Sequence, residues 1–267
     1  MILAGRTALI TGASSGLGAA FAQELARRKV NLVLVARSEK TLIETANKLH
    51  REYGVRVDVI VQDLALEGAA SAVCHRLDEL GVRVNLLVNN AGFAIQGRFE
   101  TIPAHRDHRQ VMLNVATVFD LTHALLPGML AGGTGGIINV ASLGGFQPAP
   151  YLAVYAATKA FMLSFSQALS AEVRGRGVAV LALCPGPVDT NFFDVLGSRA
   201  AAIGQQLDAA TIVTEALDAL ERGAVVLVPG WRNRLMAHAV RLLPLRVVLA
   251  AAERGTRRVI IDSLISS

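Results

Sequence analysis

Tyr155 and Lys159 are the two side chains whose types and spacing most clearly suggest chemistry in this sequence. Residues four apart lie on the same face of a helix, so this spacing brings a phenol and an ammonium group together. A nearby cation favours the phenolate and lowers a tyrosine pKa whose reference value is about 10. We therefore expect Lys159 to lower the pKa of Tyr155 so that the phenol exchanges a proton near neutral pH. A pair with this spacing also arises by chance, so the interpretation depends on the elements that position it.

A glycine-rich turn lies near the N-terminus, between an apolar run over residues 7–11 and a helical pattern over 19–28. This order of strand, glycine turn and helix is the context in which proteins bind a dinucleotide. Glycines let the backbone approach the pyrophosphate, and the helix N-terminus offers free N–H groups and a positive dipole end. The first gap between the glycines is one residue longer than in the common fingerprint. We predict that the turn binds a dinucleotide through Gly12, Ser14, Ser15, Gly16, Leu17 and Gly18.

The second predicted strand, over residues 31–36, ends without an acidic residue. An enzyme that prefers NAD places Asp or Glu there to bind the ribose 2′-hydroxyl. This chain instead continues with Arg37 and Ser38, which can hold a 2′-phosphate through charge-assisted hydrogen bonds. The sequence therefore predicts NADP(H) as the cofactor.

Strand and helix patterns alternate along the chain. Predicted strands cover residues 7–11, 31–36, 55–61, 85–88, 137–140, 178–183 and 224–228, with helical patterns between them. This alternation predicts a Rossmann-type, doubly wound, parallel sheet of seven strands with helices on both faces. We expect one domain over residues 1–229 and a basic helical extension over 230–267. Ligands then belong at the carboxyl ends of the strands.

The net charge of +5 is concentrated in the C-terminal extension. Residues 230–267 contain seven arginines against Glu253 and Asp262, so the rest of the chain is neutral. A neutral body does not have the basic footprint of a nucleic-acid-binding protein. The extension is also apolar, and such a segment either lies on an anionic membrane surface or packs on the enzyme or a partner subunit. Pro244 and the interspersed arginines argue against a membrane-spanning helix.

Other features of the chain suggest neither a metal site nor secretion. Cys74 and Cys184 share no metal-binding or redox spacing, so we expect two small buried thiols. The two histidines within 105–108 lie at a predicted helix start, where a solvated turn is expected and no metal. The start of the chain lacks the charged and apolar regions of a signal peptide, which predicts a cytoplasmic protein.

With these motifs the chain resembles the short-chain dehydrogenase/reductase family over residues 5–229. The motifs that carry the resemblance occur in the family's order: the glycine turn, Asn89-Asn90-Ala91-Gly92, Asn114, Ser142, Tyr155 with Lys159, and Pro185-Gly186. The tail and the predicted pocket look similar to the branch that reduces 3-oxoacyl or 17-beta-hydroxysteroid-type ketones. The resemblance also implies a homodimer or homotetramer built on the helices that carry Asn114 and Tyr155.

The resemblance assigns a role to each matching residue. Tyr155 exchanges a proton with the carbonyl oxygen, Lys159 lowers its pKa and binds the nicotinamide ribose, Ser142 orients the carbonyl, and Asn114 holds a relay water. Asp63 lies at the adenine ring, Asn89 beside the adenosine ribose, and Val188 and Thr190 near the carboxamide. The remaining implied contacts to the cofactor are Leu64, Ala91, Gly92, Pro185 and Gly186.

Three segments are expected to line a substrate pocket that contains no cluster of basic residues. They contribute Phe93, Ile95, Leu143, Phe146, Tyr151, Phe192, Phe193, Val195 and Leu196. An apolar pocket favours an apolar ketone or aldehyde over a small charged acid. We therefore predict reduction of such a carbonyl with NADPH. Two alternatives stay open: an alcohol dehydrogenase working in the oxidative direction, and an NADP(H)-binding regulatory or membrane-peripheral module without turnover.

Overall fold

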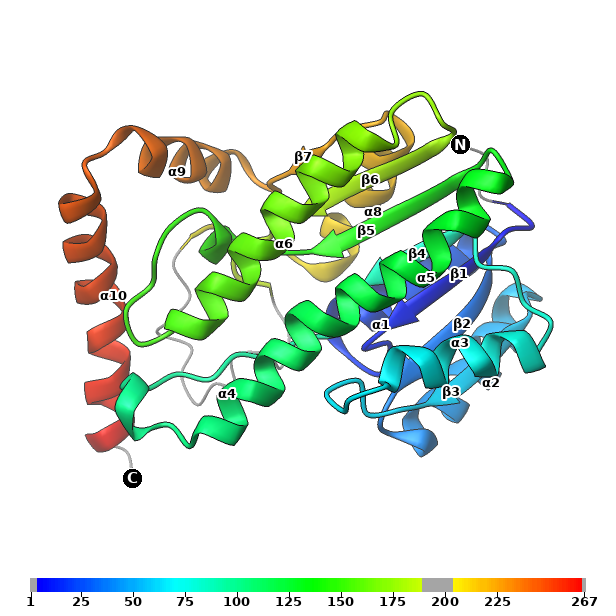
Figure 1. Ribbon diagram of the computed structural model, residues 1–267, viewed down its shortest axis with the longest axis horizontal. Coiled ribbons are helices and arrows are strands. Elements are labelled where there is room, and N and C mark those ends of the chain that lie inside the picture. The colour runs from blue at the N-terminus through cyan, green and yellow to red at the C-terminus, as the bar shows by residue number, and fades with distance from the viewer. Residues whose placement is uncertain (1–3, 189–203, 266–267) are drawn as a thin grey trace.

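A seven-stranded parallel sheet forms the centre of the molecule (Figure 1). The computed structural model describes residues 4–188 and 204–265, with the backbone alone described over 257–265. The spatial order of the strands is β3-β2-β1-β4-β5-β6-β7. Their bounds are β1 Thr7–Thr11, β2 Asn31–Ala36, β3 Val57–Val61, β4 Leu86–Asn89, β5 Gly135–Val140, β6 Val178–Leu183 and β7 Val226–Leu227. The predicted Rossmann-type fold is confirmed.

Helices cover both faces of the sheet and bury it in two separate cores. One face carries α1 (Gly16–Arg27), α2 (Glu39–Tyr53) and α8 (Ala209–Glu221). The other carries α3 (Ala69–Glu79), α5 (Thr117–Ala131) and α6 (Ala153–Glu172). Because both faces are covered, the central strands are apolar throughout rather than alternating, as the sequence pattern indicated.

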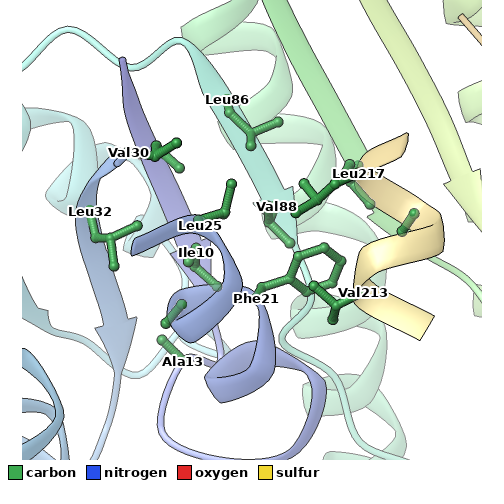
Figure 2. Packing of buried hydrophobic residues seen from close by; sticks show 14 of the residues in the cluster. Ile10, Ala13, Phe21, Leu25, Val30, Leu32, Leu86, Val88, Val213 and Leu217 are labelled. Atoms are coloured by element: carbon green, nitrogen blue, oxygen red, sulfur yellow. The ribbon is translucent and has the colours of Figure 1, made fainter. Parts of the chain in front are cut away.

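Phe21 is the largest side chain buried in the core on the face of α1 and α8. Figure 2 shows its ring extending from α1 toward Val213 and Leu217 of α8, beside Val88 of β4. Full burial of a phenylalanine side chain contributes about 1.5–3 kcal/mol. The contact therefore fixes α1, and with it the turn before α1, against the sheet.

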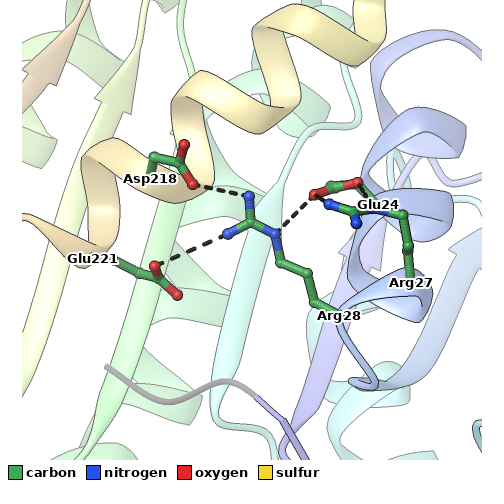
Figure 3. A network of polar contacts seen from close by, with 5 residues as sticks. All are labelled: Glu24, Arg27, Arg28, Asp218 and Glu221. Carbon is green, nitrogen blue, oxygen red and sulfur yellow. Dashed lines mark hydrogen bonds and ion pairs between the residues drawn. The ribbon is translucent and has the colours of Figure 1, made fainter.

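A group of ion pairs joins the same two helices at their surface (Figure 3). The Arg28 guanidinium lies 2.8 Å from Glu24 and 2.8 Å from Asp218 of α8. Hydrogen bonds from Arg27 and Arg28 hold the pKa of Glu24 below its ordinary value, against the opposing effect of burial. This group adds a polar link between α1 and α8 to the apolar one made by Phe21.

The helix before β5 is continuous from residue 104 to 131 but changes its winding in the middle. It consists of α4 (Ala104–Val111), a π-helical segment (Met112–Ala116) and α5. Its length and composition alone would allow it to cross a membrane. It is part of the folded domain, however, because α5 packs on α3 and the sheet while α4 packs on α6.

The C-terminal extension forms two helices, α9 (Trp231–Leu242) and α10 (Leu245–Ile265), which meet at Pro244. Figure 1 shows α10 running along the side of the molecule, next to the loop that precedes α6. Asn233 fixes the start of α9, since its amide donates to the carbonyl oxygens of Gln205 (3.0 Å) and Pro229 (2.9 Å). The structure therefore packs the extension against the sheet domain.

Both cysteines are free thiols. Cys184 is buried at the end of β6, and burial raises its pKa to about 12. Cys74 is only half-buried, which departs from the expectation of two buried thiols.

Candidate active site

A cavity of about 580 Å³ opens at the carboxyl ends of the strands. Successive strands are added in one direction from β1 to β3 and in the opposite direction from β4 to β7, so the cavity lies at the switch point between β1 and β4. Open α/β sheets bind ligands at such switch points. Turns that follow β1, β2, β3, β4, β5 and β6 contribute to its walls, together with α9 and α10. The cavity is therefore an elongated site built from segments far apart in the sequence.

The glycine turn after β1 forms one wall of the cavity, as the sequence predicted. Gly12 and Gly16 adopt left-handed backbone conformations, with φ of +66° and +55°. A side chain at Gly18 would place its Cβ in collision with the Gly12 carbonyl oxygen. Gly18 does not line the cavity itself, and its role is to let α1 begin in contact with the turn.

Asn90 attaches this turn to the neighbouring strand. Its side-chain amide donates to the carbonyl oxygens of Thr11 (2.9 Å) and Gly12 (3.3 Å), and its own N–H donates to the Thr11 hydroxyl (2.9 Å). Asn90 also lines the cavity. Sequence analysis missed this role, because only the tertiary pairing of β1 with β4 brings the two turns together.

One end of the cavity is polar and charged. Arg37, Ser38, Asp63 and Arg109 line it. Asp63 accepts hydrogen bonds from the Ala65 N–H at 3.0 Å and from the Arg109 guanidinium at 2.7 Å. Burial favours a higher pKa for Asp63, but these hydrogen bonds and the charges of Arg109 and Arg37 bring the pKa below its ordinary value. Asp63 is therefore a carboxylate held between two cations, and Arg109 is a site residue that no sequence motif indicated.

Three of the four predicted catalytic residues line the opposite part of the cavity. Ser142, Tyr155 and Lys159 lie there, on the turn after β5 and on α6. The Ser142 hydroxyl accepts a hydrogen bond from the Gly144 N–H at 3.1 Å and is also hydrogen-bonded to Tyr155. Lys159 is buried, and its ammonium group donates to the Val140 carbonyl oxygen at 2.7 Å. The predicted serine, tyrosine and lysine thus meet at one end of the site.

The expected effect of Lys159 on Tyr155 is not what the structure shows. Desolvation raises the pKa of Tyr155, and the hydrogen bond with Ser142 offsets only part of that increase. Burial also lowers the pKa of Lys159 to about 8. The Lys159 nitrogen lies 5.7 Å from the centroid of the tyrosine ring and bonds to backbone instead. The cost of removing the two groups from water therefore exceeds the attraction between them that the spacing suggested.

Asn114 lies behind the cavity wall, in the π-helical segment. It is fully buried, and its amide donates to the Phe93 carbonyl oxygen (3.0 Å) and the Thr158 hydroxyl (3.2 Å), while its oxygen accepts from the Phe93 N–H (3.3 Å). Asn114 therefore ties the turn after β4 to the helix that carries Tyr155. A π-helical turn is frequent at functional sites, and no sequence pattern indicated this one.

The structure places Asn89 away from the expected position beside a ribose. Asn89 is buried within the sheet layer and does not line the cavity. Its amide donates to the Asn139 side-chain oxygen (2.8 Å) and to the Thr122 hydroxyl (3.2 Å), and the Asn139 amide donates to the Ser166 hydroxyl (2.9 Å). The residue at the cavity is its neighbour Asn90, because successive strand residues point to opposite faces.

Most of the other predicted contact residues line the cavity. They are Gly12, Ser14, Ser15, Gly16, Leu17, Arg37, Ser38, Asp63, Leu64, Ala91, Gly92, Pro185, Gly186 and Val188 for the cofactor and Phe93, Leu143 and Phe146 for the substrate. Ile95 and Tyr151 are not among the lining residues. Thr190, Phe192, Phe193, Val195 and Leu196 lie outside the described residues.

The C-terminal extension supplies a wall that the sequence did not assign to the site. Met236, Ala237 and Val240 of α9 and Ala252 and Thr256 of α10 line the cavity. Within each helix these residues are spaced so that they lie on one face. This spacing is the signal in the sequence that could have indicated which side of each helix faces inward. Residues 230–267 were predicted as an extension that either lies on a membrane or packs on the enzyme or a partner subunit, and in the structure side chains of α9 and α10 line the pocket.

Comparison with known proteins identifies the family. Residues 6–200 match the short chain dehydrogenase family, and the chain belongs to this family of oxidoreductases. A very-long-chain 3-oxoacyl-CoA reductase from Anas platyrhynchos is 34% identical over 192 residues, which are 70% of this chain and 61% of the relative. The chain therefore spans less than two thirds of that relative's length.

Two solved structures are similar over nearly the whole chain. A short-chain dehydrogenase from Sphingobium yanoikuyae in complex with NADPH has a TM-score of 0.81 and 36% identity, covering 88% of this chain and 92% of that one. A bulky-bulky ketone specific alcohol dehydrogenase from Comamonas testosteroni has a TM-score of 0.75 and 34% identity, covering 89% and 93%.

Proposed function

We propose that this protein reduces an apolar ketone or aldehyde to the alcohol with NADPH. The observation that carries the proposal is that one cavity joins a glycine turn and a cationic end to a serine, tyrosine and lysine at the other end. The relatives support it, since the similar structure from Sphingobium yanoikuyae contains NADPH and the avian relative is a 3-oxoacyl-CoA reductase.

The residues present fit NADPH. Gly12 and Gly16 line the cavity without side chains, so a pyrophosphate could approach the backbone of the turn there. Arg37 and Ser38 would hold the 2′-phosphate, and Asp63 would face the adenine. When bound at the other end, the reduced nicotinamide supplies the hydride for the carbonyl carbon.

Tyr155 and Ser142 provide the protein's part of the chemistry. The Ser142 hydroxyl can donate to the carbonyl oxygen and orient it toward the phenol. Because its pKa is raised, Tyr155 carries its proton at neutral pH, the form needed to protonate a carbonyl oxygen during reduction. The Lys159 nitrogen lies 5.7 Å from the centroid of the Tyr155 ring, so its charge would act on an oxygen held by the phenol as negative charge develops there.

The part of the cavity beyond Tyr155 favours an apolar substrate. Its described lining includes Phe93, Leu143, Phe146, Met236 and Val240. Among the described lining residues, the charged side chains other than Lys159 are Arg37, Asp63 and Arg109, all at the opposite end. An alkyl chain or ring would be desolvated by these side chains.

Turnover of a ketone panel tests this proposal. NADPH oxidation is measured with wild type and Tyr155→Phe on ketones from small and polar to long-chain and steroid-like. We expect turnover of apolar ketones and a loss of about 10²–10⁴-fold in the variant. Tyr53→Phe, which changes a tyrosine at the end of α2, serves as the matched control. Tight NADPH binding without turnover of any ketone would contradict the proposal and favour the binding-module alternative.

We also propose a homo-oligomer in a cytoplasmic location with peripheral membrane contact. Val111, Phe119 and Phe161 are exposed on the helices that carry Asn114 and Tyr155, which supports assembly through this surface. Analytical ultracentrifugation of wild type and Phe161→Asp tests the assembly. A wild-type monomer would refute it. The membrane contact involves the extension and is developed below.

A further inference from the structure

The two helices of the C-terminal extension each have an inner and an outer face. The inner faces are already occupied, because Met236, Ala237 and Val240 of α9 and Val248 and Ala252 of α10 point into the molecule. The Gln96 amide reaches the backbone of α10 at 3.5 Å, and Asn233 fixes the start of α9. The outer faces therefore have a fixed orientation relative to the cavity.

The outer faces are unusually apolar for a solvent-exposed surface. We call them together the outer tail face, formed by Trp231, Arg232, Arg234, Leu235, Leu242, Leu243, Leu245, Arg246, Val247, Leu249 and Arg254. Of the fourteen large hydrophobic residues exposed among the described residues, seven lie in the short stretch 231–249. Leu242 is 85% exposed, Leu235 63% and Leu245 60%. Exposed large apolar side chains gathered in one stretch of chain indicate an interaction site.

The charge of the same face is positive. Residues 230–267 account for the whole net charge of the protein, and four of their arginines belong to the outer tail face. Among the described side chains of α9 and α10, the one acidic group is Glu253. The Arg232 guanidinium lies over the Trp231 ring at 5.3 Å, a combination of apolar body and polar tip suited to the headgroup region of a lipid bilayer.

We propose that the outer tail face docks on an anionic membrane surface. Apolar side chains enter the boundary of headgroups and acyl chains, and the arginines contact the anionic headgroups. A second copy of this chain fits the face less well, because a symmetric interface would place the arginines of one copy against those of the other. Charge complementarity therefore selects the membrane.

Docking would place the catalytic cavity next to the lipid. The outer tail face and the cavity are separated by the thickness of one helix, about 10 Å. The inner residues Met236 and Val240 would then lie between the membrane and the catalytic tyrosine. We infer, resting on the proposed reductase activity, that the substrate is a long-chain carbonyl compound dissolved in the membrane.

Vesicle sedimentation tests the docking without any turnover. The full chain is mixed with phosphatidylcholine vesicles with and without 30% phosphatidylserine. We expect binding to the anionic vesicles, and a loss of about 30-fold in the double variant Arg232→Gln/Arg234→Gln, since each basic residue near an anionic surface strengthens binding about fivefold. The matched control, Lys48→Gln/Arg51→Gln on α2, removes the same charge far from the tail and should bind within twofold of wild type.

The outcomes separate docking from catalysis. Absence of binding to anionic vesicles, or an equal loss in the α2 control, would overturn the docking proposal. The docking proposal would also be overturned if wild type were a dimer and Leu242→Ser/Leu245→Ser a monomer that binds vesicles as well as wild type does. A second copy of the chain would then occupy the outer tail face. Tyr155→Phe should still bind vesicles, so a failure of the reductase proposal leaves the docking result readable.

A rate comparison tests the substrate class. A long-chain ketone is presented in anionic vesicles or in neutral detergent micelles, beside a small water-soluble ketone. Wild type should reduce the vesicle-borne ketone at least tenfold faster than the arginine double variant, while both reduce the small ketone at equal rates. Equal rates on the vesicle-borne ketone would refute delivery from the membrane.

Discussion

Replacement of Lys159 by methionine should stabilise the cofactor-free protein near neutral pH. Lys159 is 95% buried and its pKa falls from 10.5 to about 8 in the fold. Keeping the charged form at pH 7 therefore costs about 3 kcal/mol of folding free energy. Methionine has a similar length without the charge. It also loses the hydrogen bond to the Val140 carbonyl oxygen, a loss of about 1 kcal/mol, so the net gain at pH 7 is about 2 kcal/mol.

The size of this effect falls as the pH rises. Below pH 8 both the folded and the unfolded chain carry the Lys159 proton, so wild type bears the full cost. Between pH 8 and 10.5 the unfolded chain keeps the proton and the folded chain releases it, so the stability of wild type rises with pH. The advantage of the methionine variant should fall from about 2 kcal/mol at pH 7 to below about 0.5 kcal/mol at pH 9.5.

Urea unfolding followed by circular dichroism measures this difference. Both proteins are unfolded without nucleotide at pH 7, 8, 9 and 9.5, and the free energies of unfolding are subtracted so that other titrating groups cancel. Lys48→Met, at an exposed position on α2, should show no pH-dependent difference. A methionine variant less stable than wild type at pH 7, or a difference constant from pH 7 to 9.5, would refute the reasoning.

Three further predictions concern the turn, the sheet and the pocket. Gly18→Ala should abolish NADPH binding measured by fluorescence titration, because its Cβ would collide with the Gly12 carbonyl oxygen and displace the turn. Asn139→Leu should lower the free energy of unfolding by about 2–4 kcal/mol in urea titrations, since the hydrogen bond to Ser166 is lost and buried polar groups are left unpaired. Met236→Trp should raise KM for long-chain ketones about tenfold while kcat for a small ketone stays constant.

Each of these predictions has a result that would contradict it. Unchanged NADPH affinity in Gly18→Ala would mean that the turn tolerates the displacement. A loss below about 1 kcal/mol in Asn139→Leu would mean that the buried hydrogen bonds add little beyond the packing that leucine restores. An equal change for long and small ketones in Met236→Trp would place α9 outside the substrate path.

Local patterns were enough to predict the fold and the parts of the site that follow strand ends. Parallel strands bring their carboxyl ends to one edge, so the turns at Gly12 and Ser142 had to meet there once the alternation of strands and helices was recognised. The position of Asn89 beside a ribose was implied by the resemblance to the family, and the structure has Asn90 at the cavity instead. A one-residue difference at a strand end decides which face a side chain occupies, and a pattern does not locate strand ends that closely.

Other parts of the site depend on tertiary packing that no local pattern encodes. Arg109 reaches Asp63 because the helix before β5 contacts the turn that follows β3, where the Thr117 hydroxyl also donates to the Leu64 carbonyl oxygen. The π-helical winding that buries Asn114 is likewise fixed by the packing of its neighbours. Burial also reversed the expected pKa of Tyr155, because desolvation of a side chain depends on everything that surrounds it.

The origin of the cavity walls has a consequence for how such a protein changes over evolutionary time. Tyr155 and the glycine turn belong to residues 6–200, the stretch that matches the family model, whereas α9 and α10 begin after it. The substrate end of the cavity combines both parts, with Phe93, Leu143 and Phe146 from the first and Met236 and Val240 from the second. Substitutions in the last two helices can therefore reshape one wall of the pocket while Ser142, Tyr155 and Lys159 stay in place, and a protein engineer can use the same wall.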